Sequence, residues 1–189
     1  SSIGWKVGED WGLEVSLPWN FDYALSGRDT RLEVEKWRKM GVKTADNKKI
    51  SLPAKEKVSI IVPEGRKGKA YLVRENFRKI MNWNRSENYA LADYVRTGKK
   101  WKPVEQNPAV RVKTDDVLKI QSFVNKLGWF KLDEDGQLGS KTRSAIKKVQ
   151  AEAKMPQDGY PDYQLLQKIN RYNPNIGFAV PVPERKLHK

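Results

Sequence analysis

The sequence contains no cysteine and only one histidine, His188, close to its carboxyl end. Without cysteine the chain can form no disulfide bond, offer no thiolate ligand to zinc and use no cysteine nucleophile. One histidine in a basic tail supplies neither a catalytic triad nor a polyhistidine metal centre. We therefore expect no metal site and no cofactor.

Long apolar runs are also missing, so the sequence predicts no membrane-spanning helix and at most a peripheral association with a membrane. The chain opens at Ser1 without a methionine or a charged-then-apolar leader, and we expect any export signal to lie upstream. The formal net charge of +14 predicts attraction to nucleic acid, anionic lipid or an anionic cell wall. Charge alone does not choose among them, and a lysine-rich surface tuned for solubility explains it as well.

Three segments of the first half have the pattern of β-strands. Residues 11–17 alternate apolar with small or polar side chains, which predicts a strand with one buried face. Residues 58–62 and 70–73 are β-type runs, and the turn-rich segment 64–68 between them suits a hairpin. A small antiparallel sheet is therefore expected.

Helical patterns accompany these strands. Thr30, with Glu33 three residues later, forms a capping-box pattern, and Val34, Trp37 and Met40 follow it at helical spacing before Gly41. This predicts a short helix that starts after a Thr30 cap and ends at Gly41. Apolar residues recur at helical spacing from residue 74, and the polar segment 82–86 interrupts them. The first half is thus predicted to be an α+β unit.

A change in composition divides the chain. Residues 99–112 have no periodicity and contain two prolines, so we expect a linker there, after a first domain at 1–98. A helical domain at 113–170 and a flexible tail at 171–189 are expected to follow. Three helices are predicted in that second domain, beginning at a Thr114 cap, a Ser140 cap and Pro161.

Ordered phrases in the first half resemble the second half of the catalytic domain in the lytic murein transglycosylase B family. The resemblance extends over roughly residues 4–96. The phrases are Trp11-Gly12-Leu13-Glu14-Val15, Phe21-Asp22-Tyr23-Ala24-Leu25, Pro63-Glu64-Gly65, Asn76-Phe77-Arg78-Lys79-Ile80-Met81 and Trp83-Asn84-Arg85-Ser86-Glu87-Asn88-Tyr89-Ala90. The resemblance implies part of a lysozyme-like domain in the bacterial periplasm or cell envelope.

Residues 115–169 are similar to the peptidoglycan-binding type 1 domain, which is often fused to such enzymes. Two phrases carry this similarity, Asp135-Gly136-x-x-Gly139-x-x-Thr142-x-x-Ala145-Ile146 and Asp158-Gly159-Tyr160-Pro161. We interpret Gly136 and Gly139 as structural residues that permit tight turning before a helix, rather than as ligand contacts. The similarity implies peptidoglycan glycan strands as the partner, and it leaves the oligomeric state open.

The family resemblance also implies a chemistry. Its members cleave the bond after N-acetylmuramic acid without water, and one glutamate acts first as acid and then as base. That glutamate lies in the first half of the family's domain, so we assign no catalytic residue here and expect the chain alone to be inactive. The resemblance also implies that Trp83, Asn84, Ser86 and Tyr89 bind substrate in the sugar cleft, where amide and phenol groups can bond acetamido and hydroxyl groups of sugars.

Less specific readings of several residues stay open. Asn84 could be a helix cap and Tyr89 a core residue, while Glu75 is expected to be a helix-start carboxylate with no catalytic role. Trp11 and Trp37 are expected in the core, and residues 133–136 are expected to form a turn and no calcium loop. A non-catalytic peptidoglycan-binding protein is the alternative function, and nucleic-acid binding has only charge in its favour.

Overall fold

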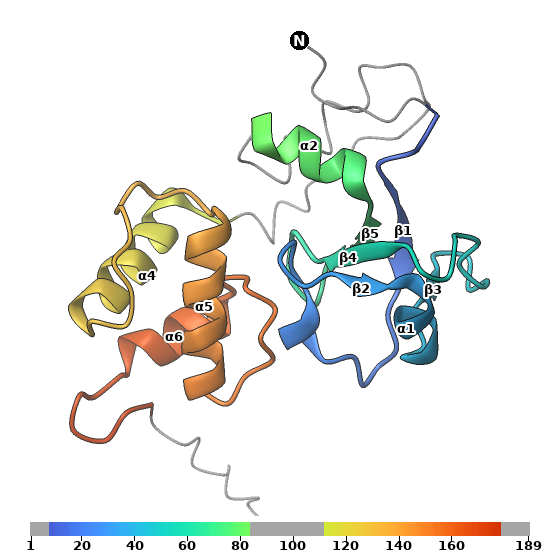
Figure 1. Cartoon of the computed structure of the whole chain (residues 1–189). Helices are drawn as coiled ribbons and strands as arrows, with labels where there is room; N and C mark the ends of the chain where they lie inside the picture. The colour runs from blue at the N-terminus through green and yellow to red at the C-terminus, as the bar shows by residue number, and fades with distance from the viewer. Residues whose placement is uncertain (1–7, 84–111, 179–189) are drawn as a thin grey trace, which may run out of the picture.

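The structure is a computed structural model that describes residues 8–83 and 112–178 (Figure 1). The first range, here named the sheet unit, carries five strands, two α-helices and one 3-10 helix; the second, the helical module, carries three α-helices. In chain order they are β1 Gly12–Ser16, η1 Tyr23–Leu25, β2 Leu32–Glu33, α1 Val34–Lys39, β3 Lys43–Thr44, β4 Lys57–Ile61, β5 Ala70–Val73, α2 Glu75–Trp83, α4 Thr114–Lys126, α5 Ser140–Glu152 and α6 Tyr163–Asn170.

The predicted antiparallel sheet is present and has the strand order β2-β4-β5-β1-β3. The hairpin of β4 and β5 is confirmed, with Ile60 opposite Leu72. The first strand, β1, lies between β5 and the short β3, so the centre of the sheet joins segments far apart in sequence. The short strands β2 and β3, two residues each, were too brief for the sequence pattern to predict.

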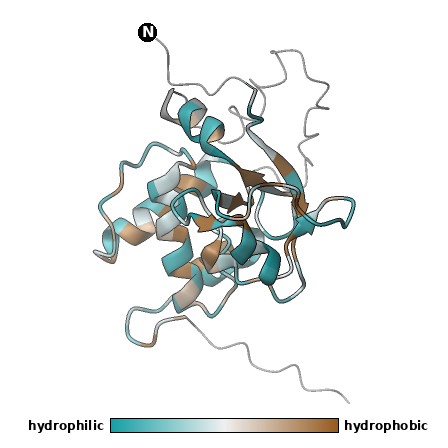
Figure 2. Cartoon of the chain, turned by 45° about the vertical axis from the view of Figure 1, so that its right-hand side comes forward, coloured by the Kyte–Doolittle hydropathy of each residue, from teal (hydrophilic) through white to brown (hydrophobic). Residues whose placement is uncertain are grey.

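The β4–β5 hairpin is buried on both faces of the sheet, which explains why β5 is apolar along its length and why β4 is apolar apart from Lys57 and Ser59. Ile60 and Leu72 face a core on the side of α1, together with Trp37. Ile61 and Val73 face a second core on the side of α2. The two helices lie on opposite sides of the sheet (Figure 1), and Figure 2 colours much of the sheet between them brown, as hydrophobic residues.

The alternation over residues 11–17 predicted one buried face, and this is correct only from Leu13 onward. Leu13 and Val15 pack in the α1-side core, whereas Trp11 packs in the α2-side core. The change of side occurs at Gly12, where an added Cβ would lie 2.0 Å from the carbonyl oxygen of Leu72. Only glycine permits this approach, and it lets the chain enter the sheet from the opposite side.

The helix predicted after the capping box exists, but its predicted start is wrong. The cap position is Glu33, which makes no side-chain capping bond, and the helix begins at Val34. Residues of the predicted first turn form β2 instead and pair with β4, with Leu32 opposite Val58. Strand pairing therefore overrides the local capping signal. Trp37 is fully buried, as expected, and donates to the carbonyl of Val58 at 3.1 Å.

The helical module has a core of its own. Ile120 and Val124 of α4 pack on Ile146 and Val149 of α5, and Leu165 of α6 completes the cluster. The three-helix prediction is thus confirmed. Its predicted helix starts are each misplaced by one or two residues. The cap positions are Lys113 and Gly139 in place of Thr114 and Ser140, and the third helix begins at Tyr163 in place of Pro161.

Part of the predicted flexible tail packs on this module. The ring of Tyr172 lies 5.1 Å from that of Phe123, and Phe178 contacts both rings. Residues 173 and 177 form an isolated antiparallel bridge that closes the turn between them. The expectation of a flexible tail from residue 171 is therefore wrong up to residue 178. In the two described ranges, no helix has the length and apolarity needed to cross a membrane.

Candidate functional site

The residues predicted to bind sugar fall at the edge of the described structure. Trp83 is the last residue of α2, and nothing further is described of its side chain. Asn84, Ser86 and Tyr89 lie outside the described residues. Their role as a substrate-binding set stays a prediction, and what the structure adds is the position of the helix that leads to them.

That helix is held on the sheet at its amino end. Phe77 and Met81 are buried in the α2-side core beside Trp11. Glu75, in the first turn, pairs with Arg31 at 2.9 Å on a surface where both side chains are 37% exposed. This carboxylate therefore serves as a helix-start residue, as expected, and the packing fixes the direction in which α2 presents its carboxyl end.

A second region of interest lies where the helical module meets the sheet unit; we call it the domain interface. The turn between β4 and β5 projects into the module through Arg66. Its guanidinium donates to Asp162 at 2.9 Å and to Asp158 at 3.4 Å, and its backbone amide donates to Asp158 at 2.9 Å. The Asp158 side chain is only 2% exposed and that of Arg66 19%, so this ion pair is largely shielded from solvent.

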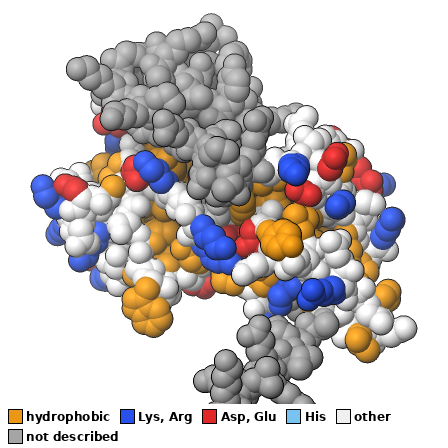
Figure 3. All heavy atoms as spheres, turned by 180° about the vertical axis from the view of Figure 1, so that it is seen from behind, with side chains coloured by type: hydrophobic (Ala, Val, Ile, Leu, Met, Phe, Trp, Pro, Cys, Tyr) orange, Lys and Arg blue, Asp and Glu red, His pale blue; other side chains and the backbone are white. Residues whose placement is uncertain are grey.

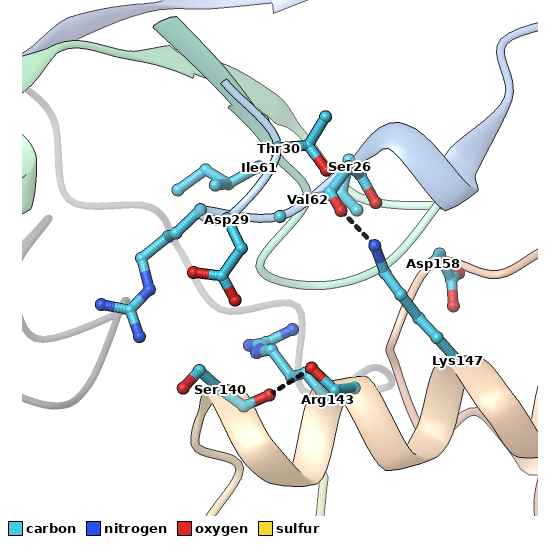
Figure 4. Close-up of a pocket in the computed structure, with 12 residues that line it drawn as sticks. Ser26, Asp29, Thr30, Ile61, Val62, Ser140, Arg143, Lys147 and Asp158 are labelled. Carbon is cyan, nitrogen blue, oxygen red and sulfur yellow. Dashed lines mark hydrogen bonds between the residues drawn. The ribbon is translucent and has the colours of Figure 1, made fainter. Parts of the chain in front are cut away.

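Helix α5 contributes the other half of the domain interface. Arg143 donates to the carbonyl of Pro63 at 3.0 Å, at the start of the same turn. One helical turn later, Lys147 donates to the carbonyls of Ala24 and Ser26, which belong to η1 and its cap (Figure 4). Since all three acceptors are backbone carbonyls, the module is oriented by the shape of the sheet unit as well as by charge.

Close packing accompanies these bonds. Gly65 has a φ of +76°, and a Cβ there would lie 2.8 Å from the Cβ of Tyr160 and 2.9 Å from Asp158 Oδ2. Burial, reinforced by the nearby Glu64 carboxylate, raises the pKa of Tyr160 to about 12. Burial also raises the pKa of Tyr23, with the Asp158 charge as the next cause. Both phenols thus stay neutral at physiological pH.

Asp158 is fixed in place by a buried glutamine of α5. The side-chain amide of Gln150 donates to Asp158 Oδ1 at 2.6 Å and to the carbonyl of Tyr160 at 3.2 Å. Its oxygen accepts the backbone amide of Gly159 at 2.9 Å. Every one of these groups is buried, so the network presents Asp158 to Arg66 in one orientation.

Helix α4 carries a matching arrangement. Gln121 donates to Asp135 Oδ1 and accepts from the backbone amide of Gly136, both at 2.9 Å. Gly136 has a φ of +69°, and a Cβ there would lie 2.4 Å from Thr114, which supports its interpretation as a structural glycine. Gly139 has open space around the position of a Cβ and an ordinary negative φ. Asp135 is thus occupied in a turn, in agreement with the interpretation of residues 133–136.

A pocket of about 200 Å³ opens along the domain interface (Figure 4). One wall is the segment 26–30 with the end of β4, and the other is the first two turns of α5 with Asp158. Three cationic side chains line it, Arg28, Arg143 and Lys147, together with the Asp29 carboxylate. On the face drawn in Figure 3, lysine and arginine side chains are scattered among acidic ones.

The sequence pattern identified the Asp158-Gly159 motif but missed what it contacts. Arg66 stood in a segment interpreted only as a hairpin turn, and Gln150 looked like one polar residue of a helix. The sequence signal that could have identified Gln150 is that each Asp-Gly pair follows a helix with a glutamine. These glutamines are Gln121 before Asp135 and Gln150 before Asp158. Among residues 8–83 and 112–178, no group of three or more acidic, histidine or cysteine side chains is placed to hold a metal ion.

Comparison with protein families matches both parts of the chain. Residues 1–96 match the model of the transglycosylase SLT domain. Residues 113–169 match the model of the peptidoglycan binding domain. A search of curated protein sequences gave no significant match.

Solved structures give a likeness over both units together. The crystal structure of SltB3 from Pseudomonas aeruginosa in complex with NAG-anhNAM-pentapeptide is 34% identical, with a TM-score of 0.70. The match covers 89% of this chain and 46% of that one. SltB3 in complex with NAG-NAM-pentapeptide matches at the same identity and TM-score, over 88% and 46%. The chain thus spans less than half the length of this relative.

Proposed function

Because this chain belongs to the transglycosylase SLT domain family, we propose that it forms part of a lytic transglycosylase acting on peptidoglycan. The reaction is the non-hydrolytic cleavage of the MurNAc-GlcNAc bond, which leaves an anhydro-muropeptide. In this proposal the proton-donating glutamate lies outside the chain, whose own residues supply a wall of the sugar cleft and a module that retains the protein on the cell wall.

The observation that carries the proposal is the joint match of both units to one relative. SltB3 matches 89% of the chain, so the likeness extends over the sheet unit and the helical module together. That protein was crystallised with an anhydro-sugar peptide, the type of molecule that non-hydrolytic cleavage produces. The match of the module to a peptidoglycan binding domain supports the same substrate independently.

The proposed sugar contacts are Trp83, Asn84, Ser86 and Tyr89. The packing of Phe77 in the α2-side core supports this assignment, because it fixes the helix that ends at Trp83. An amide at Asn84 can donate to and accept from an acetamido group, and a phenol at Tyr89 can stack on a sugar ring and bond its hydroxyls.

We place the protein in the bacterial cell envelope, and more narrowly in the periplasm. Both family matches support an envelope location, because peptidoglycan is found there. A fractionation experiment on the native host tests the narrower statement, and recovery in the cytoplasmic fraction would contradict it.

The activity itself is tested with purified sacculi. The chain alone is expected to pellet with sacculi and to release no anhydro-muropeptide detectable by mass spectrometry. In the complete enzyme, Asn84→Ala and Tyr89→Phe are each expected to lower kcat/KM at least about tenfold, which is about 1.4 kcal/mol of transition-state stabilisation.

Tyr163→Phe is the matched control, because Tyr163 is a 73% exposed tyrosine of α6 outside the proposed cleft. It is expected to keep wild-type activity. Binding of sacculi by a complete enzyme that releases no products would favour the non-catalytic peptidoglycan-binding alternative. Retention on duplex DNA in place of sacculi, falling steeply between 50 and 200 mM salt, would indicate a nucleic-acid binder.

A further inference from the structure

We propose that one end of the sheet unit binds the surface of an anionic phospholipid bilayer. This surface lies around α1 and β3, on the side of the sheet unit away from the helical module (Figure 1). The inference goes beyond the proposed function, because the proposed sugar contacts follow α2, which packs on the opposite side of the sheet from α1. We name the surface the lysine face, and it comprises Trp19, Lys36, Lys39, Met40, Lys43, Lys48 and Lys49.

The charge of the lysine face is strongly positive. Residues 35–49 contain six cationic and two acidic side chains. Both carboxylates are paired within the segment, Glu35 with Lys39 at 3.5 Å and Asp46 with Lys48 at 3.3 Å. Three exposed lysines pair with no carboxylate in the part of the chain that the structure describes, namely Lys36, Lys43 and Lys49.

The fold brings these lysines together from two segments. The guanidinium of Arg38 donates to the carbonyl of Ile50 at 2.9 Å and to that of Leu52 at 2.5 Å, which ties the segment after β3 to α1. As a result, Lys39 and Lys49 line one hollow. Because Arg38 is occupied by these carbonyls, the cations that the face presents to solvent are lysines.

A fully exposed tryptophan projects from the same face. Trp19 is 96% exposed, whereas Trp37 is fully buried. Trp19 occupies the corner of a tight turn, closed by a bond from the amide of Phe21 to the carbonyl of Pro18 at 3.0 Å. Phe21 is itself buried, with its ring 6.1 Å from that of Trp37. This packing anchors the turn, so the outward position of Trp19 is built into the fold.

The turn lies against the end of α1. A Cβ at Gly41 would lie 3.5 Å from the Cβ of Pro18, and the residue before Gly41 is the exposed Met40. Just before the turn, Ser16 of β1 pairs with Lys43 of β3. The two apolar members of the face therefore lie beside its lysines.

This combination fits a bilayer better than a nucleic acid. Tryptophan rings are enriched at the headgroup level of membranes, where anionic lipids attract neighbouring basic side chains. The ammonium group of lysine is a point charge and lacks the forked donors with which arginine recognises single phosphates. Aromatic residues stack on the bases of single strands, which a duplex does not expose. A plane of anionic headgroups matches both the spread of the lysines and the projecting ring.

The test measures binding of the whole chain to vesicles by co-sedimentation. Vesicles of equal parts phosphatidylglycerol and phosphatidylcholine are the anionic probe, and vesicles of phosphatidylcholine alone are the neutral probe. Each lysine near an anionic surface strengthens binding about fivefold, so binding to the neutral vesicles is expected to be at least about a hundredfold weaker.

A triple variant locates the site. Lys36→Gln, Lys43→Gln and Lys49→Gln together are expected to weaken binding to anionic vesicles at least about thirtyfold. The control removes the same net charge far from the face, and it is expected to bind within about threefold of wild type because salt screens distant charges. It makes the same change at three exposed lysines of the helical module, Lys119, Lys126 and Lys131.

Trp19→Phe tests the insertion of the ring. Brominated acyl chains quench the fluorescence of tryptophans that reach the bilayer. The variant is expected to lose at least about half of the quenching of wild type while it still binds, because phenylalanine supplies a similar apolar ring.

Three results would overturn the proposal. They are equal loss of binding in the two triple variants, unchanged quenching in Trp19→Phe, and tighter retention of the chain on duplex DNA than on anionic vesicles at the same salt concentration. Sacculus pelleting separates this inference from the proposed function. A chain that binds vesicles but not sacculi contradicts only the proposed function, and one that binds sacculi but not vesicles contradicts only the role of the lysine face.

Discussion

The two halves of the helical module contain the same kind of turn, but only the turn in the second half contacts the sheet unit. In each, a buried glutamine of one helix holds an Asp-Gly turn through the aspartate and the glycine amide. The turn after α4 ends with an exposed Asp135, whereas the turn after α5 ends with an Asp158 that is almost fully buried against Arg66. One turn serves only the module, and the other also joins two domains.

This difference shows where the stability of the interface originates. Asp135 uses one oxygen for Gln121 and the amide of Gln137. Asp158 uses one oxygen in the same manner, for Gln150 and the amide of Tyr160, and gives the other to Arg66. The turn after α5 thus has the same internal bonds as the turn after α4, and it also contacts the sheet unit because the second carboxylate oxygen of Asp158 accepts from Arg66.

The largest effect is expected from removing the glutamines. Gln150→Ala should lower the free energy of unfolding by about 3 kcal/mol, because it leaves the buried amide of Gly159 without its partner and removes one bond from the buried Asp158. Gln121→Ala should cost about 1 kcal/mol less, since water can reach the exposed Asp135. Urea unfolding of both variants measures the difference. Equal costs would mean that burial of the second turn adds nothing.

The next effect comes from the aspartates themselves. Asp158→Asn is expected to destabilise the chain by about 2 kcal/mol, because Arg66 loses one partner in a shielded environment. Asp135→Asn should stay within about 0.5 kcal/mol of wild type, as surface substitutions usually do. Thermal unfolding of the two proteins makes this comparison, and a reversed order would contradict the assigned role of Asp158.

Docking is tested from the other side by Gly65→Ala. The new Cβ would lie within 3 Å of Tyr160 and Asp158 at a positive φ, so we expect the interface to open at a cost of about 1–2 kcal/mol. The two units should then melt in separate transitions in calorimetry. Gly177→Ala is the control, because it shares a φ of +77° but has nothing within 4 Å. A single transition in both variants would show that the units do not depend on this contact.

The smallest effect is a dependence on pH. The backbone amide of Gln137, and then the Gln121 side chain, lower the pKa of Asp135. A lowered pKa in the folded state stabilises the chain above the unfolded value of about 3.9, and this is lost as pH falls through the folded value. The stability difference between wild type and Asp135→Asn should therefore shrink below about pH 4. Urea midpoints from pH 6 to 2.5 measure it.

Much of the fold could be predicted from the sequence because its signals are local. The period of the apolar residues located β1, the β4–β5 hairpin and the three module helices. Helix starts were misplaced where a contact decided them. Leu32 pairs with β4 instead of entering α1, and α6 begins after Asp162, which caps it by accepting from the amide of Leu165, instead of at Pro161. Local residue preferences are weaker than such contacts.

The domain interface could not be predicted, for a physical reason. Arg66 and Asp158 are 92 residues apart, and each has an ordinary local explanation as a turn residue. No periodicity in either segment signals that the two meet. Of the proposed sugar-binding residues, Trp83 is placed at the end of α2, and Asn84, Ser86 and Tyr89 stay predictions made from the family resemblance alone.

The β4–β5 turn both joins two strands and contacts the helical module, and this should restrict how its length varies among related proteins. Turns that join two strands are usually the places where related proteins gain or lose residues, because they lie free in solvent. Here Pro63, Gly65 and Arg66 all contact the helical module. An insertion would push the arginine out of reach of its carboxylates, so this turn should keep a constant length among relatives that carry the module and vary in length among those without it.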